Sequence, residues 1–381
     1  MADETIKIQS MKFTVSSSQL LKQLQMAGGA IQSRPVIPIL EGFLFKVAGN
    51  ELVITASDLE TSITTRLEVQ AEGEGSVAIP ARILTDTLKQ LPEQPITFDI
   101  DEETYMVQLT SAYGKYKLAG APGDDFPATP QPETEDEVRL PGAVVQQAVS
   151  KTIFAAADDE LRPAMSGVFF QIDFDKFRTV ATDAHKLVRY TYLAMGDNKV
   201  ASQFIVPRKS LNLLKGILGE EEVAVAFDSK FVFFTSGDSR LSCRLIDAQY
   251  PDYNAVIPVD NPNHLTVSRQ DLLSSMKRIS IYANQTTNQV MFEINSSTLT
   301  ITAQDLDFAN EATEQLHCSY EGDTLAIAFN AKFLIEMLSA LDSENVEFSL
   351  FSPTRAALIK PTEQAEDEDI LMLLMPVMLT V

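Results

Sequence analysis

A carboxylate and an imidazole lie two residues apart in the string Thr182-Asp183-Ala184-His185-Lys186. These residue types could transfer a proton in catalysis. However, Asp58 and Asp305 stand at the matching place in two similar segments, and no histidine follows either of them. The aspartate is therefore better explained as a turn residue that caps its own backbone. We predict no catalytic role for His185.

A second acidic group is the run Asp158-Asp159-Glu160. Adjacent carboxylates at the end of a predicted helix do not converge on one point, and no histidine pair stands near them at metal-ligand spacing. The sequence also contains neither a GxxxxGK[ST] phosphate loop nor a GxGxxG fingerprint. We therefore predict no metal site, no cofactor and no enzymatic activity. The enzymatic alternative is a metal-dependent phosphoesterase, which predicts divalent-ion binding and turnover and would use Asp158, Asp159, Asp183 and His185.

Asp58, Asp183 and Asp305 mark an internal repeat. Each follows a segment with the pattern of strand, turn and strand, and they stand 125 and 122 residues apart. Two further landmarks recur with the same period: a short strand before the first helical pattern, and a Pro or Asn before a basic residue at the start of the second. This agreement indicates three similar domains, each with two helices. Acidic, Pro-rich linkers place the domain edges near residues 134 and 262.

Charge is unevenly distributed between the predicted helices and the rest of the chain. The 381 residues carry a net charge of -23, which by itself argues against nucleic acid, because phosphate binding needs clustered Lys and Arg. The predicted helices nevertheless hold eleven basic and five acidic residues, in the windows 16–33, 81–92, 141–158, 207–219, 268–285 and 330–343. This segregation indicates a basic helical face and an acidic sheet face.

A basic residue also recurs near the start of the second helix of each repeat, where a cation opposes the helix dipole. Helix starts with added Lys or Arg are good contacts for phosphates, and contacts of this kind hold a nucleic-acid backbone without reading its bases. The alternative is that these side chains extend into solvent or pair with acidic neighbours.

The remaining composition favours a cytoplasmic protein. The longest nearly apolar run covers only ten residues, 370–379, below the ~20 that a membrane-spanning helix needs. The first ten residues lack the basic start and apolar centre of a secretion signal. Cys243 and Cys318 stand far apart and without metal-ligand spacing.

Several short motifs follow one another over nearly the whole chain: MKFTV at 11–15, RP at 34–35 with PIL at 38–40, TASDLE at 55–60, VAIPAR at 77–82, DFP at 125–127, TVATD at 179–183, VPRK at 206–209, YPDY at 250–253 and MP at 375–376. Together they resemble the bacterial DNA polymerase III beta subunit, the replicative sliding clamp. The resemblance implies an α+β fold of three similar DNA-clamp domains at 11–134, 135–262 and 263–381, each with two helices packed on antiparallel sheets. Residues 1–10 have no counterpart in the family and form an N-terminal extension.

The family forms a ring, and the resemblance implies the same here. Two chains would join head to tail as a homodimer, with helices lining the hole and sheets outside. The ring would encircle duplex DNA independently of its sequence and tether the replicative DNA polymerase for processive synthesis. Other implied partners are the clamp loader and further proteins with a clamp-binding motif, without a membrane, which places the protein in the cytoplasm at the nucleoid.

The resemblance also assigns three sets of residues. The partner-peptide pocket, between the second and third domains, would consist of Met165, Thr182, Ala184, His185, Lys186, Leu187, Pro251, Val256, Phe333, Leu373, Met375 and Val377. The DNA-facing residues would be Arg34, Arg82, Arg162, Arg208 and Lys209. The subunit contact would place Tyr116 and Leu118 of one chain against Ile281 and Tyr282 of the other.

This chain departs from the family pattern near the pocket. Ala184 stands where glycine is usual, Lys186 where arginine is usual and Ala255 where a basic residue is often found, and residues 378–381 extend past the customary end. Without the resemblance, 371–378 would be interpreted as an ordinary buried edge strand. A third hypothesis is a repeat scaffold that binds only proteins, which would share the pocket but would not need basic helices.

Overall fold

The computed structural model describes residues 10–133, 137–159, 161–196 and 198–378. All of the predicted extension except Ser10 therefore lies outside the described residues, as do Glu160 and the last three residues of the C-terminal tail. The chain packs as two compact units, one within Met1–Val145 and Lys209–Leu245 and the other within Gln146–Arg208 and Ile246–Val381. In the described part of the chain, no helix is long and apolar enough to cross a membrane.

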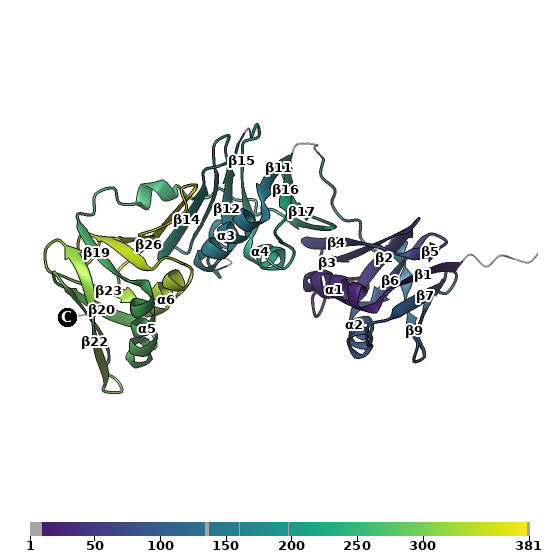
Figure 1. Cartoon of the computed structure of the whole chain (residues 1–381), viewed down its shortest axis with the longest axis horizontal. Helices are drawn as coiled ribbons and strands as arrows, with labels where there is room; N and C mark the ends of the chain where they lie inside the picture. The colour runs from purple at the N-terminus through teal and green to yellow at the C-terminus, as the bar shows by residue number, and fades with distance from the viewer. Residues whose placement is uncertain (1–9, 134–136, 160, 197, 379–381) are drawn as a thin grey trace, which may run out of the picture. The chain divides into compact units, whose positions relative to one another are not determined.

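Six α-helices occur in the described residues, two in each predicted repeat (Figure 1). They are α1 (Ser17–Ala27), α2 (Ala81–Gln90), α3 (Gly142–Thr152), α4 (Arg208–Leu214), α5 (Arg269–Ile279) and α6 (Ala331–Ser339). Helix α1 packs on α2, and α5 packs on α6. The prediction of two helices in each repeat is confirmed.

Local sequence explains where these helices begin. The side chains of Ser16, Ser268 and Asn330 accept hydrogen bonds from free backbone N–H groups in the first turns of α1, α5 and α6, as expected of N-cap residues. Pro80 directly precedes α2, and Pro207 precedes α4. Proline is most common at the first helical position, and both of these prolines lie one residue before it.

The first unit contains two antiparallel sheets. The five-stranded sheet has the order β5-β1-β7-β8-β9, and the nine-stranded sheet has the order β10-β6-β2-β3-β4-β18-β17-β16-β11. Strand β4 of the first repeat pairs with β18 of the second, from Thr61↔Cys243 to Thr65↔Ser239. The strands are β1 (Ser10–Ser16), β2 (Gly42–Ala48), β3 (Glu51–Ser57), β4 (Thr61–Glu68), β5 (Gln70–Glu72), β6 (Gly75–Pro80), β7 (Pro95–Asp101), β8 (Met106–Thr110), β9 (Lys115–Ala119), β10 (Ala121–Pro122), β11 (Glu137–Pro141), β16 (Glu222–Phe227), β17 (Phe231–Ser236) and β18 (Ser239–Arg244).

The second unit contains one antiparallel sheet of twelve strands. Its order is β15-β12-β13-β14-β26-β25-β24-β19-β22-β21-β20-β23, and β14 of the second repeat pairs with β26 of the third along its whole length. The strands are β12 (Gly167–Ile172), β13 (Phe177–Thr182), β14 (Lys186–Tyr192), β15 (Ser202–Pro207), β19 (Asn263–Ser268), β20 (Gln289–Ile294), β21 (Thr298–Asp305), β22 (Asn310–Glu321), β23 (Leu325–Asn330), β24 (Asn345–Leu350), β25 (Ala357–Pro361) and β26 (Glu368–Leu374).

Aromatic side chains form the cores in which each helix pair is packed. In the first repeat, the rings of Phe13 and Phe98 stack at 4.8 Å and Phe45 lies against both. In the third repeat, Phe292 contacts Phe329 and Phe348 edge to face. Phe45 and Phe292 occupy matching positions in the repeat. The first and third repeats therefore share an aromatic core position as well as a pair of helices.

Candidate partner pocket, nucleic-acid interface and subunit contact

The turn between β13 and β14 carries the string that was most similar to a catalytic site. Oδ1 of Asp183 accepts hydrogen bonds from the backbone N–H groups of His185 at 2.8 Å and Lys186 at 2.9 Å. Asp58 and Asp305 bind the backbone of their own turns in the same way. The interpretation of these aspartates as turn residues is therefore confirmed, and Asp183 holds backbone rather than the imidazole.

The enzymatic alternative required Asp158, Asp159, Asp183 and His185 to converge. Asp158 instead forms an ion pair with Arg208, and Oδ2 of Asp159 accepts a hydrogen bond from Nε of Arg162 at 3.0 Å. His185 is exposed, with its ring stacked on Phe333 at 6.3 Å between centroids. No cluster of three metal-ligating side chains occurs anywhere in the described residues.

Lys186 connects the turn to helix α6. Its Nζ lies 2.9 Å from Oε2 of Glu336 and 3.3 Å from Oδ2 of Asp183, and it stands 4.0 Å from the centre of the Phe333 ring. Only 6% of the Lys186 side chain is exposed. A buried ammonium needs such partners because its desolvation is costly. Lys186 therefore fixes the turn and α6 in one arrangement.

The C-terminal segment lies beside this turn. Lys186 and Leu187 pair with Leu374 and Leu373 across β14 and β26. Beyond β26, the backbone N–H of Met375 donates to the carbonyl of His185 at 2.9 Å, and that of Val377 donates to Ala328 at 2.8 Å. Residues 371–374 are buried, whereas Met375 is 40% exposed. The end of the chain thus adds an accessible apolar side chain next to His185.

The other pocket residues approach from two short 3-10 turns. Met165 ends the turn Pro163–Met165, where Nη1 of Arg162 reaches both its sulfur, at 3.9 Å, and the carbonyl of Asp183, at 3.2 Å. Val256 ends the turn Tyr253–Val256 and is 58% exposed. Tyr253 belongs to one apolar cluster together with Tyr250, Leu187 and Leu373, and Pro251 follows Tyr250 directly.

Pocket residues fall into two groups by exposure. Thr182, Lys186, Leu187 and Leu373 are buried and form the floor. The residues that a ligand could touch without rearrangement are exposed or half-buried: Met165, Ala184, His185, Pro251, Val256, Phe333, Met375 and Val377. Ala184 adopts φ 76, a left-handed conformation that costs glycine least. This is the position at which the family usually has glycine.

Three of the five predicted DNA-facing residues are already in ion pairs. Arg208 pairs with Asp158, Arg162 with Asp159 and Lys209 with Asp58. Arg34 and Arg82 are exposed, and neither has an ion-pair partner within the described ranges. The alternative in which basic residues pair with acidic neighbours therefore applies to part of this set.

Asp58 is the most deeply buried of these acids, with 2% of its side chain exposed. Burial alone would raise the pKa of its carboxyl, but hydrogen bonds from Lys209, Thr61 and Gln32 outweigh burial and hold the pKa below its ordinary value. Asp58 is therefore charged at neutral pH and holds Lys209 of the next repeat against the first.

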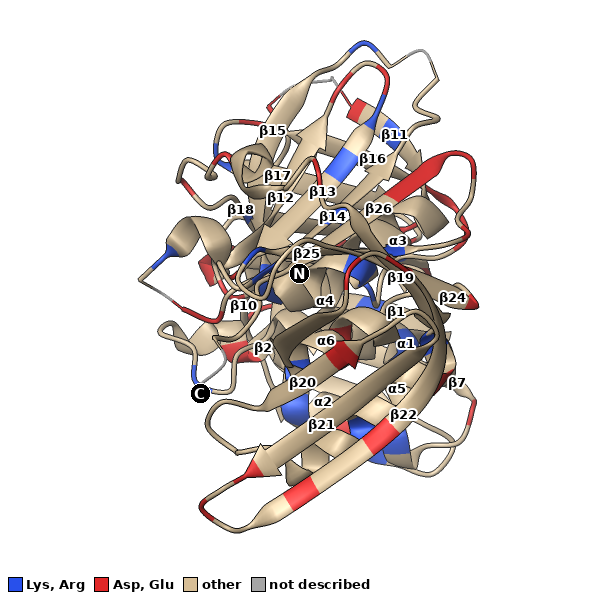
Figure 2. Cartoon of the chain, turned by 90° about the vertical axis from the view of Figure 1, so that its left-hand side faces the viewer, with Lys and Arg blue, Asp and Glu red and all other residues tan. Residues whose placement is uncertain are grey.

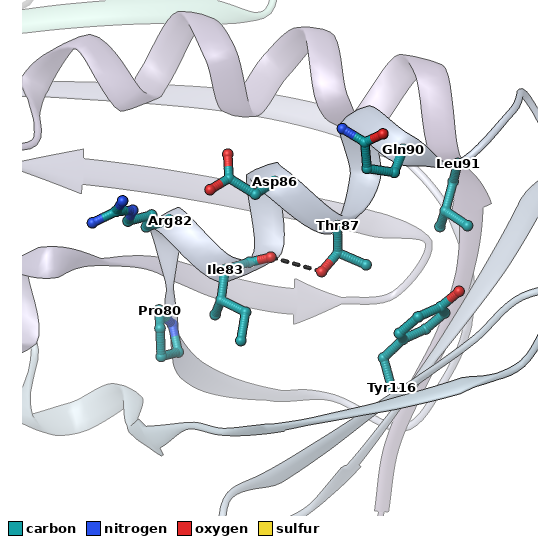
Figure 3. A pocket seen from close by; sticks show the side chains of 8 residues that line it. All are labelled: Pro80, Arg82, Ile83, Asp86, Thr87, Gln90, Leu91 and Tyr116. Atoms are coloured by element: carbon teal, nitrogen blue, oxygen red, sulfur yellow. Dashed lines mark hydrogen bonds between the residues drawn. The ribbon is translucent and has the colours of Figure 1, made fainter.

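Tyr116 and Leu118 lie on β9, the last strand of the five-stranded sheet. Tyr116 also lines a groove of about 640 Å³ along α2, together with Ile83, Thr87 and Leu91. Figure 3 shows these three side chains on the side of the helix nearer Tyr116, while Arg82 and Asp86 project away from it. Ile83 is 53% exposed. The groove is thus apolar and open.

Ile281 and Tyr282 form part of the 3-10 turn Ser280–Tyr282 that follows α5. They are 76% and 44% exposed. Beside them, residues 310–317 of β22 pair with β21, and only residues 318–321 pair with β19. Within the part of the chain that is described, the first part of β22 therefore has one side without a strand partner.

The side chains that connect these sites come from residues far apart in the chain. Glu336 holds Lys186 from a distance of 150 residues along the chain, and Asp58 holds Lys209 from 151 residues. The only available signal was the repeat itself, because Asp58 and Lys209 belong to landmarks that recur with the same period. Residue type alone gave no indication of which cation would meet which carboxylate.

Comparison with known proteins gives a consistent family over all three repeats. The models of the DNA polymerase III beta subunit match with the N-terminal domain at residues 11–130, the central domain at 139–252 and the C-terminal domain at 254–378. The beta sliding clamps of Vibrio cholerae and Escherichia coli are 30% and 31% identical, and each alignment covers 97% of this chain and 100% of the relative.

Solved structures agree. A sliding clamp from Pseudomonas aeruginosa bound to griselimycin superposes with a TM-score of 0.92 at 27% identity, and the clamp from Bacillus subtilis with 0.92 at 26%. Each match covers 97% of this chain and 100% of the other. Three domains of helix pairs on antiparallel sheets define the class of DNA clamps.

The chain belongs to the DNA polymerase III beta subunit family, the bacterial beta sliding clamps. Its function is that of a sliding clamp for the replicative polymerase, a processivity factor and not an enzyme. The predictions of family, three-domain α+β fold and function are confirmed.

Proposed function

We propose that two copies of this chain close head to tail into a ring that encircles duplex DNA. The observation that carries this proposal is the segregation of charge: the six described α-helices contain ten Lys and Arg but three Asp and Glu, in a chain of net charge -23. Figure 2 shows acidic positions along β22 and in the loops, and basic positions on helices and on some of the strands. A surface formed by the helices would attract a phosphate backbone without reading bases.

The DNA-facing surface, in this proposal, includes Arg34, Arg82, Arg162, Arg208 and Lys209. Existing ion pairs weaken several of these cations, since a paired cation must give up its carboxylate before it neutralises a phosphate. Weak, exchangeable contacts suit a protein that must move along the duplex, because sequence-independent phosphate contacts permit sliding.

Ring closure would join two open sheet edges. Strand β9 carries the exposed Lys115 and Lys117, and the unpaired side of β22 carries the exposed Glu311, so the two edges are complementary in charge. Tyr116 and Leu118 of one copy would then lie against Ile281 and Tyr282 of the other. Leu118 is buried in its own copy, with 5% exposed, so Tyr116 offers the accessible side chain, and Ile281 and Tyr282 would fill the groove along α2. A head-to-tail contact of this kind uses different surfaces of each copy and can close into a ring.

Partners would dock at the apolar surface around His185 and Met375. Short peptides of the replicative polymerase, the clamp loader and other proteins with a clamp-binding motif would insert between Met165, Val256, Phe333 and Val377. Methionine side chains adapt to different ligands, which suits a surface shared by several partners.

We also propose that the chain divides into an extension at 1–10 and domains at 11–134, 135–262 and 263–381, and that the protein is located in the cytoplasm at the nucleoid.

Topological retention tests the ring. The purified protein is loaded with a clamp loader onto nicked circular DNA, and retention is compared with that on the same DNA after linearisation, at moderate salt. We expect retention on circles and rapid loss from linear ends. Equal dissociation from both, with loading confirmed, would show ordinary surface binding and favour a scaffold that does not encircle DNA.

A further inference from the structure

Asp58 is the centre of a contact between two repeats. Its Oδ1 accepts hydrogen bonds from the backbone N–H groups of Glu60 and Thr61, at 3.1 and 2.7 Å. Its Oδ2 accepts from Nε2 of Gln32 at 3.1 Å and pairs with Lys209. Both oxygens of this buried carboxylate are therefore satisfied, and the cation comes from the next repeat.

Asp305 repeats this arrangement in the third repeat. It is 4% exposed, and its Oδ1 accepts from the backbone N–H of Asp307 at 3.1 Å and from Nδ2 of Asn284 at 3.4 Å. Gln32 and Asn284 correspond, since each stands two residues after the 3-10 turn that follows the first helix of its repeat. However, Oδ2 of Asp305 has no hydrogen-bond or ion-pair partner among the residues that the structure describes.

The second repeat shows another way to supply the cation. Asp183 pairs with Lys186 of its own turn, at 3.3 Å. The corresponding turn after Asp305 contains Leu306 and Phe308, which are 80% and 74% exposed. Asp305 therefore has a cation neither from its own turn nor from elsewhere in the described part of the chain.

The repeat also identifies the cation that fits. Lys209 is the second residue of α4 and stands two residues after Pro207. Arg82 has the same place in the first repeat, as the second residue of α2 and two residues after Pro80. Arg82 is exposed and has no ion pair within the described ranges. Among the described residues, Asp305 thus lacks a cation and Arg82 lacks an acid. The two residues stand at the positions in their repeats that Asp58 and Lys209 occupy in the contact between the first and second repeats.

We propose that Arg82 of one copy binds Oδ2 of Asp305 of a second copy, as Lys209 binds Asp58 within the chain. This inference rests on the proposed head-to-tail dimer, in which the third repeat of one copy precedes the first repeat of the next. It gives Arg82, one of the proposed DNA-facing residues, a role in ring closure.

The residues beside the pair support this assignment. Within the chain, Oγ of Ser210 and Oγ1 of Thr61 lie 2.7 Å apart beside the Lys209 contact. At the proposed contact, Ile83 follows Arg82 and Phe308 lies in the turn after Asp305, so an apolar contact replaces the polar one. Apolar side chains there would be covered on association and would exclude water from the ion pair.

A double-mutant cycle on the dimer tests the proposal. Arg82→Gln, Asp305→Asn and the double variant are compared with the wild type by the dimer dissociation constant, from sedimentation or subunit exchange. Asn keeps an oxygen for the Asp307 N–H, and thermal midpoints check that each variant is folded. We expect each single substitution to weaken the dimer about tenfold and the double variant to be no weaker than either. Arg82→Lys should retain most of the affinity, because lysine performs this role at position 209.

Two matched controls remove a cation without touching the pair. Lys89→Gln lies on the same helix as Arg82, and Lys332→Gln occupies the corresponding helix position in the third repeat. We expect less than about a twofold change from either. Additive or absent effects of Arg82→Gln and Asp305→Asn in a protein that dimerises would overturn this inference alone. A wild-type chain that stays monomeric at all concentrations tested would overturn both the inference and the proposed ring.

Discussion

The pair of Asp58 and Lys209 allows a quantitative prediction about stability. Lys209→Met keeps most of the side-chain volume but leaves the Asp58 carboxylate buried without a cation. A hydrogen bond to a charged group contributes about 1.5–3 kcal/mol, and 54% exposure of the Lys209 side chain reduces that contribution through solvent screening. We therefore expect Lys209→Met to lower the free energy of unfolding by about 1–2 kcal/mol at neutral pH.

The pH dependence has a definite sign. In the wild type the pKa of Asp58 lies below its ordinary value, so its contribution to stability is complete above the pKa of an unfolded aspartate, about 3.9. That contribution is lost as the pH falls through the lower pKa of the folded state. In Lys209→Met burial remains without the cation, so the pKa of Asp58 rises. The two proteins should differ most at neutral pH and converge in acid.

Urea unfolding followed by circular dichroism at several pH values measures this difference. Asp58→Asn retains the oxygen that accepts from the turn, and the double variant Asp58→Asn/Lys209→Met completes a cycle whose coupling energy isolates the pair. Lys22→Met, an exposed lysine on α1, is the control and should change stability little. A Lys209→Met difference that stays constant from pH 7 to pH 3, or that equals the Lys22→Met effect, would refute this account of the pair.

Three further measurements test the sites. Met375→Asp should weaken binding of a peptide with a clamp-binding motif at least tenfold in fluorescence polarisation, because it places a charge at the apolar surface; unchanged affinity would place the pocket elsewhere. Arg34→Gln should reduce the slope of log affinity against log salt on DNA by about 0.9, whereas Lys209→Gln should reduce it by less, because Asp58 already neutralises Lys209; equal slopes would contradict the ion-pair argument. Burial raises the pKa of the Cys243 thiol to about 12, so iodoacetamide should label Cys318 well before Cys243 in the folded protein, and the reverse order would show that the β4–β18 region opens.

Repetition in the sequence determined how much of the fold was predictable. Three copies of one landmark can be compared with one another, and a residue that is present in only one copy is then recognised as incidental. Asp58, Asp183 and Asp305 could be recognised as turn residues for that reason. Helix starts were predictable because Asn330 and the residues after Pro80 and Pro207 act within one turn of the chain. These interactions are local, so sequence spacing determines them.

Contacts between repeats were not predictable in the same way. Lys186 has an acid in its own turn, yet it also reaches Glu336 on α6, and nothing in the order of residues favours Glu336 over other acids of the same repeat. The resemblance supplied the list of pocket residues, but exposure separates the buried floor of Leu187 and Leu373 from the accessible rim of Val256 and Met375. That separation depends on how β26 pairs with β14, which no local pattern encodes.

The charges on the two open strand edges have a consequence for faulty assembly. An unpaired edge can recruit any other edge, including the identical edge of another copy. Lys115 would lie opposite Lys117 in an antiparallel pairing of two β9 strands centred on Tyr116, and Glu311 would lie opposite itself in a pairing of two β22 strands centred on that residue. Like charges opposite one another destabilise both symmetric pairings, and only the unlike pairing avoids this repulsion. The same side chains that favour the head-to-tail partner therefore disfavour incorrect symmetric dimers and aggregation before a newly made chain has found its partner.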